Sequence, residues 1–143
     1  MSEQLAVAVH LENEKVRFSG VGRSNPPVVF DYHPPVGDDA GYTGLEGLLM
    51  SLAACSATSV VSLLRRMHKT VSGFRVEARG DRRDEHPTVL TRIELAFLVD
   101  SPDATDVEVE RAIQLSEEKF CPVWAMLRGN VVVVATHRIT GGA

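Results

Sequence analysis

Three short apolar-rich segments near the N-terminus are predicted to be strands, and in the first two large apolar residues alternate with small or polar ones. These segments are Leu5–Leu11, Val16–Ser19 and Val28–Tyr32. Such alternation is typical of half-buried strands, and Asn13-Glu14 between the first two segments predicts a hairpin. Two prolines, three glycines and two aspartates within residues 34–44 then predict a loop.

The apolar period changes to three and four after this loop and predicts a helix that runs to about Lys69. Thr43 and Glu46 have the spacing of a capping box immediately before the apolar run. Residues 47–64 carry no charge over 18 residues, the lower limit for a membrane-spanning helix. Five hydroxyl side chains and the absence of aromatic anchors in this stretch favour a buried central helix over a membrane span.

The second half of the chain returns to alternation in Phe74–Arg79 and in Val89–Val99, which predicts an antiparallel hairpin. Caps at residues 103–106 then predict a second helix, which Pro122 ends directly after Cys121. A short helical turn follows, and residues 131–139 form the last predicted strand. No βαβ alternation is visible in this order of elements, so the sequence predicts an α+β fold.

Length and composition narrow the class of protein further. The 143 residues fit one domain over 1–143. The 15 basic and 19 acidic residues are interspersed, with a net charge of −4, so no nucleic-acid partner is expected. The N-terminus lacks the pattern of a signal peptide, which favours the cytoplasm. The five histidines lack metal-ligand spacing and no phosphate-binding loop is present, so we expect no metal and no cofactor.

The two cysteines are the candidates for chemistry. Cys55 lies in the middle of the first predicted helix, on a stripe with Ser51, Ser59 and Ser62. Cys121 lies at the N-terminal end of the short helix that Pro122 begins, where partial positive charge favours thiolate. As a pair they are compatible with a peroxidatic and a resolving thiol. The alternative is a pair of buried, inert thiols that serve only in packing.

Three charged residues could assist such a thiol. Arg17 and Arg23 lie in the region of the first strands, and an arginine beside a cysteine stabilises the thiolate. Most arginines are simply solvated, however. Glu46 is explained by its role in the capping box, and the alternative is that it orients one of these arginines.

Two long blocks of sequence resemble the OsmC/Ohr family of osmotically inducible and organic-hydroperoxide-resistance proteins. The first block is LEGLLMSLAACSATSVVSLL at residues 45–64, around Cys55, and the second is VERAIQLSEEKFCPV at residues 109–123, around Cys121. His86-Pro87 and the strand after it also resemble the hairpin of that family. The likeness extends from about Val16 to Thr140.

The resemblance implies an intertwined homodimer in which antiparallel sheets from both chains wrap two central helices, with the active sites at the interface. It also implies chemistry for the two thiols. Cys55 matches the peroxidatic cysteine, which attacks an organic hydroperoxide and becomes a sulfenic acid. Cys121 matches the resolving cysteine, which condenses with it to a disulfide. A dithiol reductant, such as a lipoyl protein, would restore both thiols.

The sequence departs from the hydroperoxide reductases of the family before the first cysteine. Those enzymes carry a glutamate after a proline, ten residues before the cysteine, whereas here Gly44 and Leu45 occupy these places and Glu46 lies at nine. One step along a helix turns a side chain by about 100°. The departure indicates the OsmC-like branch of the family.

Two hypotheses of function follow. The first is a thiol-dependent peroxidase that reduces organic hydroperoxides in oxidative-stress defence, with Cys55, Cys121, Glu46 and Arg23 or Arg17 at its site. The second is a binding or redox-sensor protein that holds a small hydrophobic or electrophilic ligand in a cleft at the dimer interface. Neither hypothesis involves a nucleic acid or a membrane.

Overall fold

The computed structural model describes residues 3–141, which fall into two compact units on either side of the boundary between Leu48 and Leu49. The prediction of one domain over 1–143 is not decided by this division and stays a prediction. Met1 and Ser2, which belong to the N-terminal segment used to exclude a signal peptide, lie outside the described residues.

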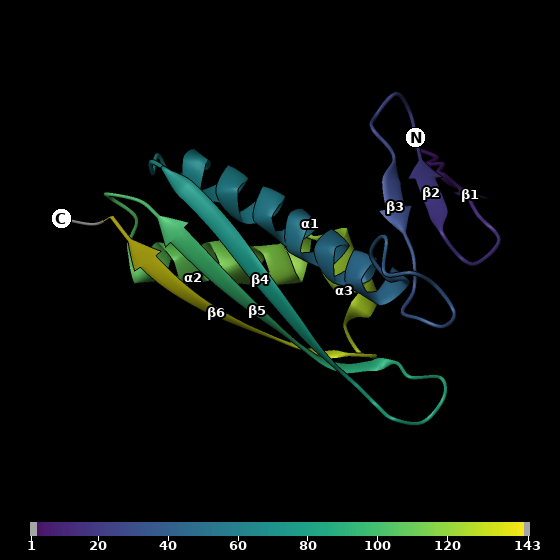
Figure 1. Cartoon of the computed structure of the whole chain (residues 1–143). Helices are drawn as coiled ribbons and strands as arrows, with labels where there is room; N and C mark the ends of the chain where they lie inside the picture. Colours follow the sequence, from purple (N-terminus) through teal and green to yellow (C-terminus); the bar gives the residue numbers. More distant parts are fainter. Residues whose placement is uncertain (1–2, 142–143) are drawn as a thin grey trace. The chain divides into compact units, whose positions relative to one another are not determined.

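The first unit contains a small antiparallel sheet with the strand order β1-β2-β3 (Figure 1). Its strands are β1 (Ala8–Leu11), β2 (Phe18–Val21) and β3 (Val28–Phe30). The three predicted strands and the hairpin between the first two are therefore confirmed. The first strand begins at Ala8 and not at Leu5, because only Ala8–Leu11 has partners on β2.

The second unit holds the remaining elements, and the helix α1 begins in the first unit and continues into it. The elements in chain order are α1 (Gly44–Arg66), β4 (Gly73–Arg82), β5 (Leu90–Asp100), α2 (Asp106–Leu115), the π-helical turn η1 (Ser116–Phe120), α3 (Pro122–Leu127) and β6 (Val132–Thr140). Each predicted helix and strand of this half is present. The second predicted helix ends in a π-helical turn, which the apolar pattern does not distinguish from α-helix.

The second sheet has the order β4-β5-β6 and mixes two directions. Strand β5 pairs with β4 in antiparallel register and with β6 in parallel register, from Arg92↔Val132 to Asp100↔Thr140. The expectations of wholly antiparallel sheets and of no βαβ unit are thus wrong for this sheet. The reason is the crossover through α2, η1 and α3, which returns the chain to the start of β5, so that β6 runs in the same direction.

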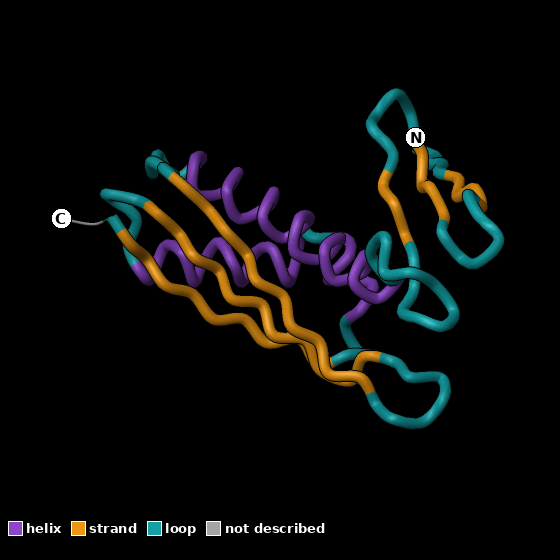
Figure 2. Tube along the Cα trace, viewed as in Figure 1, coloured by secondary structure: helices purple, strands orange, loops and turns teal. Residues whose placement is uncertain are grey.

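The hydrophobic core lies between this second sheet and its helices. Alternate residues of β5 face it, and all of them are fully or almost fully buried: Ile93, Leu95, Phe97 and Val99. Helix α1 contributes Leu52, Val60 and Leu64, while Val109, Ala112 and Trp124 come from α2 and α3. Figures 1 and 2 show α1 and α2 along the same face of the sheet.

Helix α1 is long and apolar enough to span a membrane by length and composition alone. The core helix of a water-soluble protein meets the same criteria. Here one side of α1 is buried in the core of the second unit, through Leu52, Val60, Leu63 and Leu64.

Candidate functional site

Cys121 lies where the second helical segment breaks, as the sequence predicted. Pro122 has no backbone N–H to continue the helix, and Cys121 takes an extended conformation with φ −93° and ψ 103°. Cys121 thereby becomes the N-cap of α3, and its Sγ accepts a hydrogen bond from the Trp124 backbone N–H at 3.4 Å. Cys121 is 2% exposed, so its sulfur is buried in the protein and is not open to solvent.

Cys55 lies in the middle of α1, half-buried, and meets the first turn of α3. The backbone N–H of Val123 hydrogen-bonds to its thiol, and the thiol of Cys121 lies within hydrogen-bonding reach. Both cysteines are free thiols. The fold thus brings together two thiols 66 residues apart in the sequence, at the N-terminal turn of one short helix.

The surroundings of Cys55 oppose its ionisation. Burial is the largest cause and raises the pKa of the Cys55 thiol; the Val123 N–H lowers this pKa and the neighbouring Cys121 raises it, with a net increase. None of these causes is a cationic side chain. Because the thiolate is the nucleophilic form, the Val123 N–H is the one contact among these that favours a reactive Cys55.

Two serines that the sequence analysis did not single out complete the buried surroundings of Cys121. The hydroxyl of Ser56 lies 3.5 Å from the Cys121 Sγ, and the carbonyl of Ser116 accepts from the Cys121 N–H at 2.8 Å. Both serines are 0% exposed. The position of Ser56 directly after Cys55 was the available signal; the role of Ser116 depends on the π-helical turn, which no sequence pattern predicted.

One serine of the predicted stripe around Cys55 forms a hydrogen bond within the helix. The hydroxyl of Ser59 donates to the Cys55 carbonyl at 3.2 Å, one turn back along α1. Ser51 and Ser62 lie on the exposed side of the helix. The stripe therefore does not line a common buried cleft with the thiol.

Glu46 forms the predicted capping box. Its carboxylate accepts from the Thr43 N–H at 2.9 Å, and the Thr43 hydroxyl accepts from the Glu46 N–H at 3.2 Å. Hydrogen bonds from the backbone and the side chain of Thr43 to the carboxylate lower the pKa of the Glu46 carboxyl. The capping interpretation of Glu46 is confirmed, and its action on an arginine stays a prediction.

The two candidate arginines have different surroundings within the first unit. Arg17 precedes β2 and is near Asp31, whose pKa is lowered: burial acts to raise it, but hydrogen bonds from the N–H groups of Tyr32, Ala40 and Asp38 and the charge of Arg17 outweigh burial. Arg23 lies exposed in the turn after β2, with a positive φ of 54°. The charge of Arg17 thus acts on Asp31 within its own unit, and the roles of both arginines at the thiols stay predictions.

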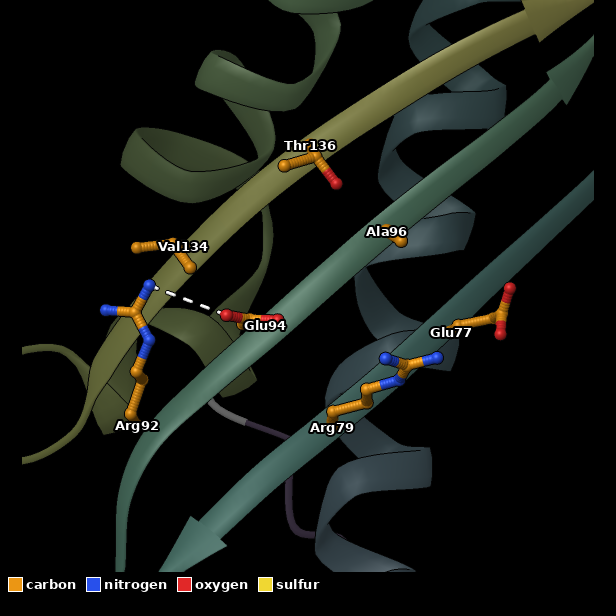
Figure 3. A pocket seen from close by; sticks show the side chains of 7 residues that line it. All are labelled: Glu77, Arg79, Arg92, Glu94, Ala96, Val134 and Thr136. Carbon is orange, nitrogen blue, oxygen red and sulfur yellow. Dashed lines mark ion pairs between the residues drawn. The ribbon is translucent and has the colours of Figure 1, made fainter.

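A hollow on the second sheet contains neither thiol. It has a volume of about 470 Å³ and is lined by Glu77, Arg79, Arg92, Glu94, Ala96, Val134 and Thr136. Figure 3 shows these side chains on the face of the sheet opposite the helices, with the Arg92–Glu94 ion pair at 3.6 Å. This hollow is a charged, solvated sheet surface, and we place the candidate site at the thiols. Within residues 3–141, no group of three or more His, Cys, Asp or Glu side chains could hold a metal ion.

Comparison with known proteins identifies the family. The OsmC-like protein family matches residues 37–136, which include both cysteines. Protein YhfA of Escherichia coli K12 is 34% identical over 126 residues, which cover 88% of this chain and 92% of that protein. The chain belongs to the OsmC-like family.

Solved structures show the same fold. An OsmC-like protein from Mycoplasma pneumoniae superposes with a TM-score of 0.84 at 19% identity, over 98% of this chain and 99% of that chain. The organic hydroperoxide resistance protein OhrB of Bacillus subtilis superposes with a TM-score of 0.65 at 15% identity, over 95% and 98%. The predicted α+β OsmC-like fold and the family assignment are confirmed.

The capping role of Glu46 predicts a pH-dependent stability. Because its folded pKa is depressed, Glu46 stabilises the fold above its unfolded value, and this contribution disappears as the pH falls through the folded value. We expect Glu46→Ala to destabilise by about 0.5 kcal/mol at neutral pH and by less in acid. Urea unfolding at both pH values measures this, with Glu85→Ala as the exposed control. A pH-independent cost would contradict the capping role.

Proposed function

We propose that this protein is a thiol-dependent peroxidase that reduces organic hydroperoxides through Cys55 and Cys121. The observation that supports the proposal is the meeting of these two thiols at the first turn of α3, where Val123 and Trp124 each direct a backbone N–H to one sulfur. Cys55 is the partly exposed thiol and Cys121 the buried one, so in the proposal Cys55 meets the substrate and Cys121 reacts with the oxidised Cys55.

The proposed reaction has two steps on the protein. The Cys55 thiolate attacks one oxygen of the hydroperoxide, the O–O bond breaks, and the alkoxide takes a proton and leaves as an alcohol. Cys121 sulfur then attacks the sulfur of the Cys55 sulfenic acid; the S–O bond breaks, and the hydroxide leaves as water with the Cys121 proton. A dithiol reductant, for which a lipoyl protein is one candidate, reduces the disulfide by thiol–disulfide exchange.

Relatives support this chemistry at the level of the family. OhrB of Bacillus subtilis is named an organic hydroperoxide resistance protein, whereas the name of YhfA states no activity. We extend the theme of hydroperoxide defence to this chain because it keeps both thiols in contact. We further propose that the protein acts in the cytoplasm, where thiols are kept reduced.

The two-thiol mechanism predicts a different fate for each thiol. We expect one equivalent of cumene hydroperoxide to remove both free thiols of the reduced wild type. Cys121→Ser should accumulate a sulfenic acid on Cys55, and Cys55→Ser should lose the reaction completely, because the nucleophile is absent. Intact mass and free-thiol counts measure all three proteins.

The same experiment separates the peroxidase from the binding or sensor hypothesis. If both wild-type thiols persist for as long as free cysteine does in the same buffer, turnover of peroxide is excluded. Screening for a saturable small hydrophobic or electrophilic ligand would then be the next step. Fast thiol loss that also occurs in Cys55→Ser would contradict the assignment of Cys55 as the nucleophile.

We propose that Arg23 supplies the positive charge that Cys55 requires, from the same chain or from a partner chain. Burial raises the pKa of Cys55, and a guanidinium close to the sulfur would lower it again. Arg17 is less suited to this role because its charge already acts on Asp31 in its own unit. Glu46 could orient Arg23 with the part of its carboxylate that the cap leaves accessible.

This assignment predicts a shift in the pH dependence of thiol reactivity. Arg23→Ala should raise the midpoint pH for alkylation of Cys55 by about one unit or more, because the thiolate loses its cation. Arg17→Ala should leave that midpoint unchanged. Iodoacetamide labelling followed by mass spectrometry of the Cys55 peptide measures both variants. The opposite result, a shift with Arg17→Ala alone, would transfer the role to Arg17.

We propose that the protein functions as a homodimer. Among the described residues of the first unit, none belongs to the buried hydrophobic core, and its sheet exposes large apolar side chains such as Val9 (58% exposed) and Leu11 (59%). Three short strands without a buried apolar face are not stable alone. Helix α1 also exposes a line of small residues, Ala54, Thr58 and Ser62 among them, which permits close approach of a second helix.

The dimer proposal predicts that a charge on the small-residue side of α1 blocks assembly. Thr58→Arg should weaken the dimer by about a hundredfold or more, because burying an unpaired charge costs several kcal/mol. Thr136→Arg, on the charged outer face of the second sheet, is the matched control and should remain dimeric. Sedimentation equilibrium measures both. A monomeric wild type at micromolar concentration would contradict the proposal.

A further inference from the structure

The hydroxyl groups of helix α1 do not all have the same kind of partner. Thr58 and Ser59 donate to the carbonyl four residues earlier, Ala54 at 2.9 Å and Cys55 at 3.2 Å, as helical hydroxyls commonly do. The Ser56 hydroxyl instead reaches across to α3 and lies 3.5 Å from the Cys121 Sγ. This contact does not satisfy a backbone group of α1, so we look for its effect on the Cys121 sulfur.

Burial makes this contact important for both atoms. Ser56 is 0% exposed and Cys121 is 2% exposed, so neither exchanges its hydrogen bond with bulk water. A buried hydroxyl without a partner is costly, and the sulfur is the partner that Ser56 has in the structure. The Cys121 sulfur therefore has two hydrogen-bonding neighbours, the Ser56 hydroxyl and the Trp124 N–H, which donates to it at 3.4 Å.

The two contacts also fix where the sulfur lies. Ser56 follows Cys55 directly on α1, so the hydroxyl that touches Cys121 belongs to the residue next to the nucleophile. A thiolate has no proton and acts only as an acceptor, so the Ser56 hydroxyl must donate to Cys121 when Cys121 ionises. Hydrogen bonds to a charged atom are stronger than those between neutral atoms.

We infer that Ser56 is a positioning residue for the resolving cysteine. Its hydroxyl stabilises the Cys121 thiolate and holds it beside Cys55, which speeds the attack of Cys121 on an oxidised Cys55 sulfur. The inference rests on the proposed function for its physiological oxidant. The attack itself requires only a leaving group on Cys55, either hydroxide from a sulfenic acid or a thiolate from a mixed disulfide.

Two reactions test the role of Ser56 separately from peroxidase activity. In the first, one equivalent of cumene hydroperoxide oxidises Cys55, and Trp124, the single tryptophan of the chain, reports disulfide formation by its fluorescence. In the second, dithiodipyridine forms a mixed disulfide on the more exposed Cys55, and absorbance follows the pyridine thiol that Cys121 displaces. The second reaction proceeds whether or not the protein reduces hydroperoxides.

Ser56→Ala removes the hydroxyl with little change of volume. We expect the displacement by Cys121 to slow about tenfold or more, the loss of one hydrogen bond to a charged atom. The oxidation of Cys55 should keep its rate, and a sulfenic acid should accumulate and react with dimedone. Ser56→Thr keeps a hydroxyl and should restore most of the rate, and Ser59→Ala is the matched control.

Other outcomes would contradict either the role of Ser56 or the proposed function. Unchanged displacement in Ser56→Ala, or an equal loss in Ser59→Ala, would overturn the role of Ser56. A loss that Ser56→Thr does not restore, accompanied by a lower unfolding temperature, would reduce Ser56 to a packing residue. Wild-type protein that undergoes displacement but never reacts with hydroperoxide would contradict the proposed function and leave the role of Ser56 supported.

Discussion

Pro122 cannot donate a backbone hydrogen bond, so the helical segment that precedes it has to end at Cys121, and the arrangement of the site follows from this break. The extended conformation of Cys121 turns its sulfur back onto the first turn of α3, where the Trp124 N–H meets it. The N–H of Val123 in the same turn meets Cys55. A single interruption of one helix thus provides donors for two thiols from distant parts of the chain.

The second sheet keeps this break in contact with α1. Strand β5 is central, and its buried residues, Leu95 and Phe97 among them, form the surface on which the helices pack. The crossover through α2, η1 and α3 must cover this face before β6 returns parallel to β5. Trp124, almost fully buried, anchors α3 in the same core that holds Leu52 and Val60 of α1. Cys55 and Cys121 are therefore held by the packing of the core.

Burial creates the proximity of the thiols and also limits their reactivity. Removing Cys55 from water raises its pKa, and the hydrogen bond from Val123 offsets only part of that cost. A nearby cation would favour the thiolate, which is why we include Arg23 in the proposed mechanism. The strands of the first unit expose large apolar side chains, which a partner chain would cover in the proposed dimer. Assembly and activation of Cys55 are thus connected in the proposal.

Sequence patterns determined the features that depend on neighbouring residues. The strands, the Thr43–Glu46 cap and the break at Cys121 are local consequences of alternation, capping and proline, and each is present in the structure. The family followed from two sequence blocks around the cysteines. The parallel direction of β6, the contact between Cys55 and Cys121, and the hydrogen bond of Ser56 depend on how distant segments pack. Tertiary structure alone decided these, because burial and sulfur contacts arise between residues that the sequence separates by dozens of positions.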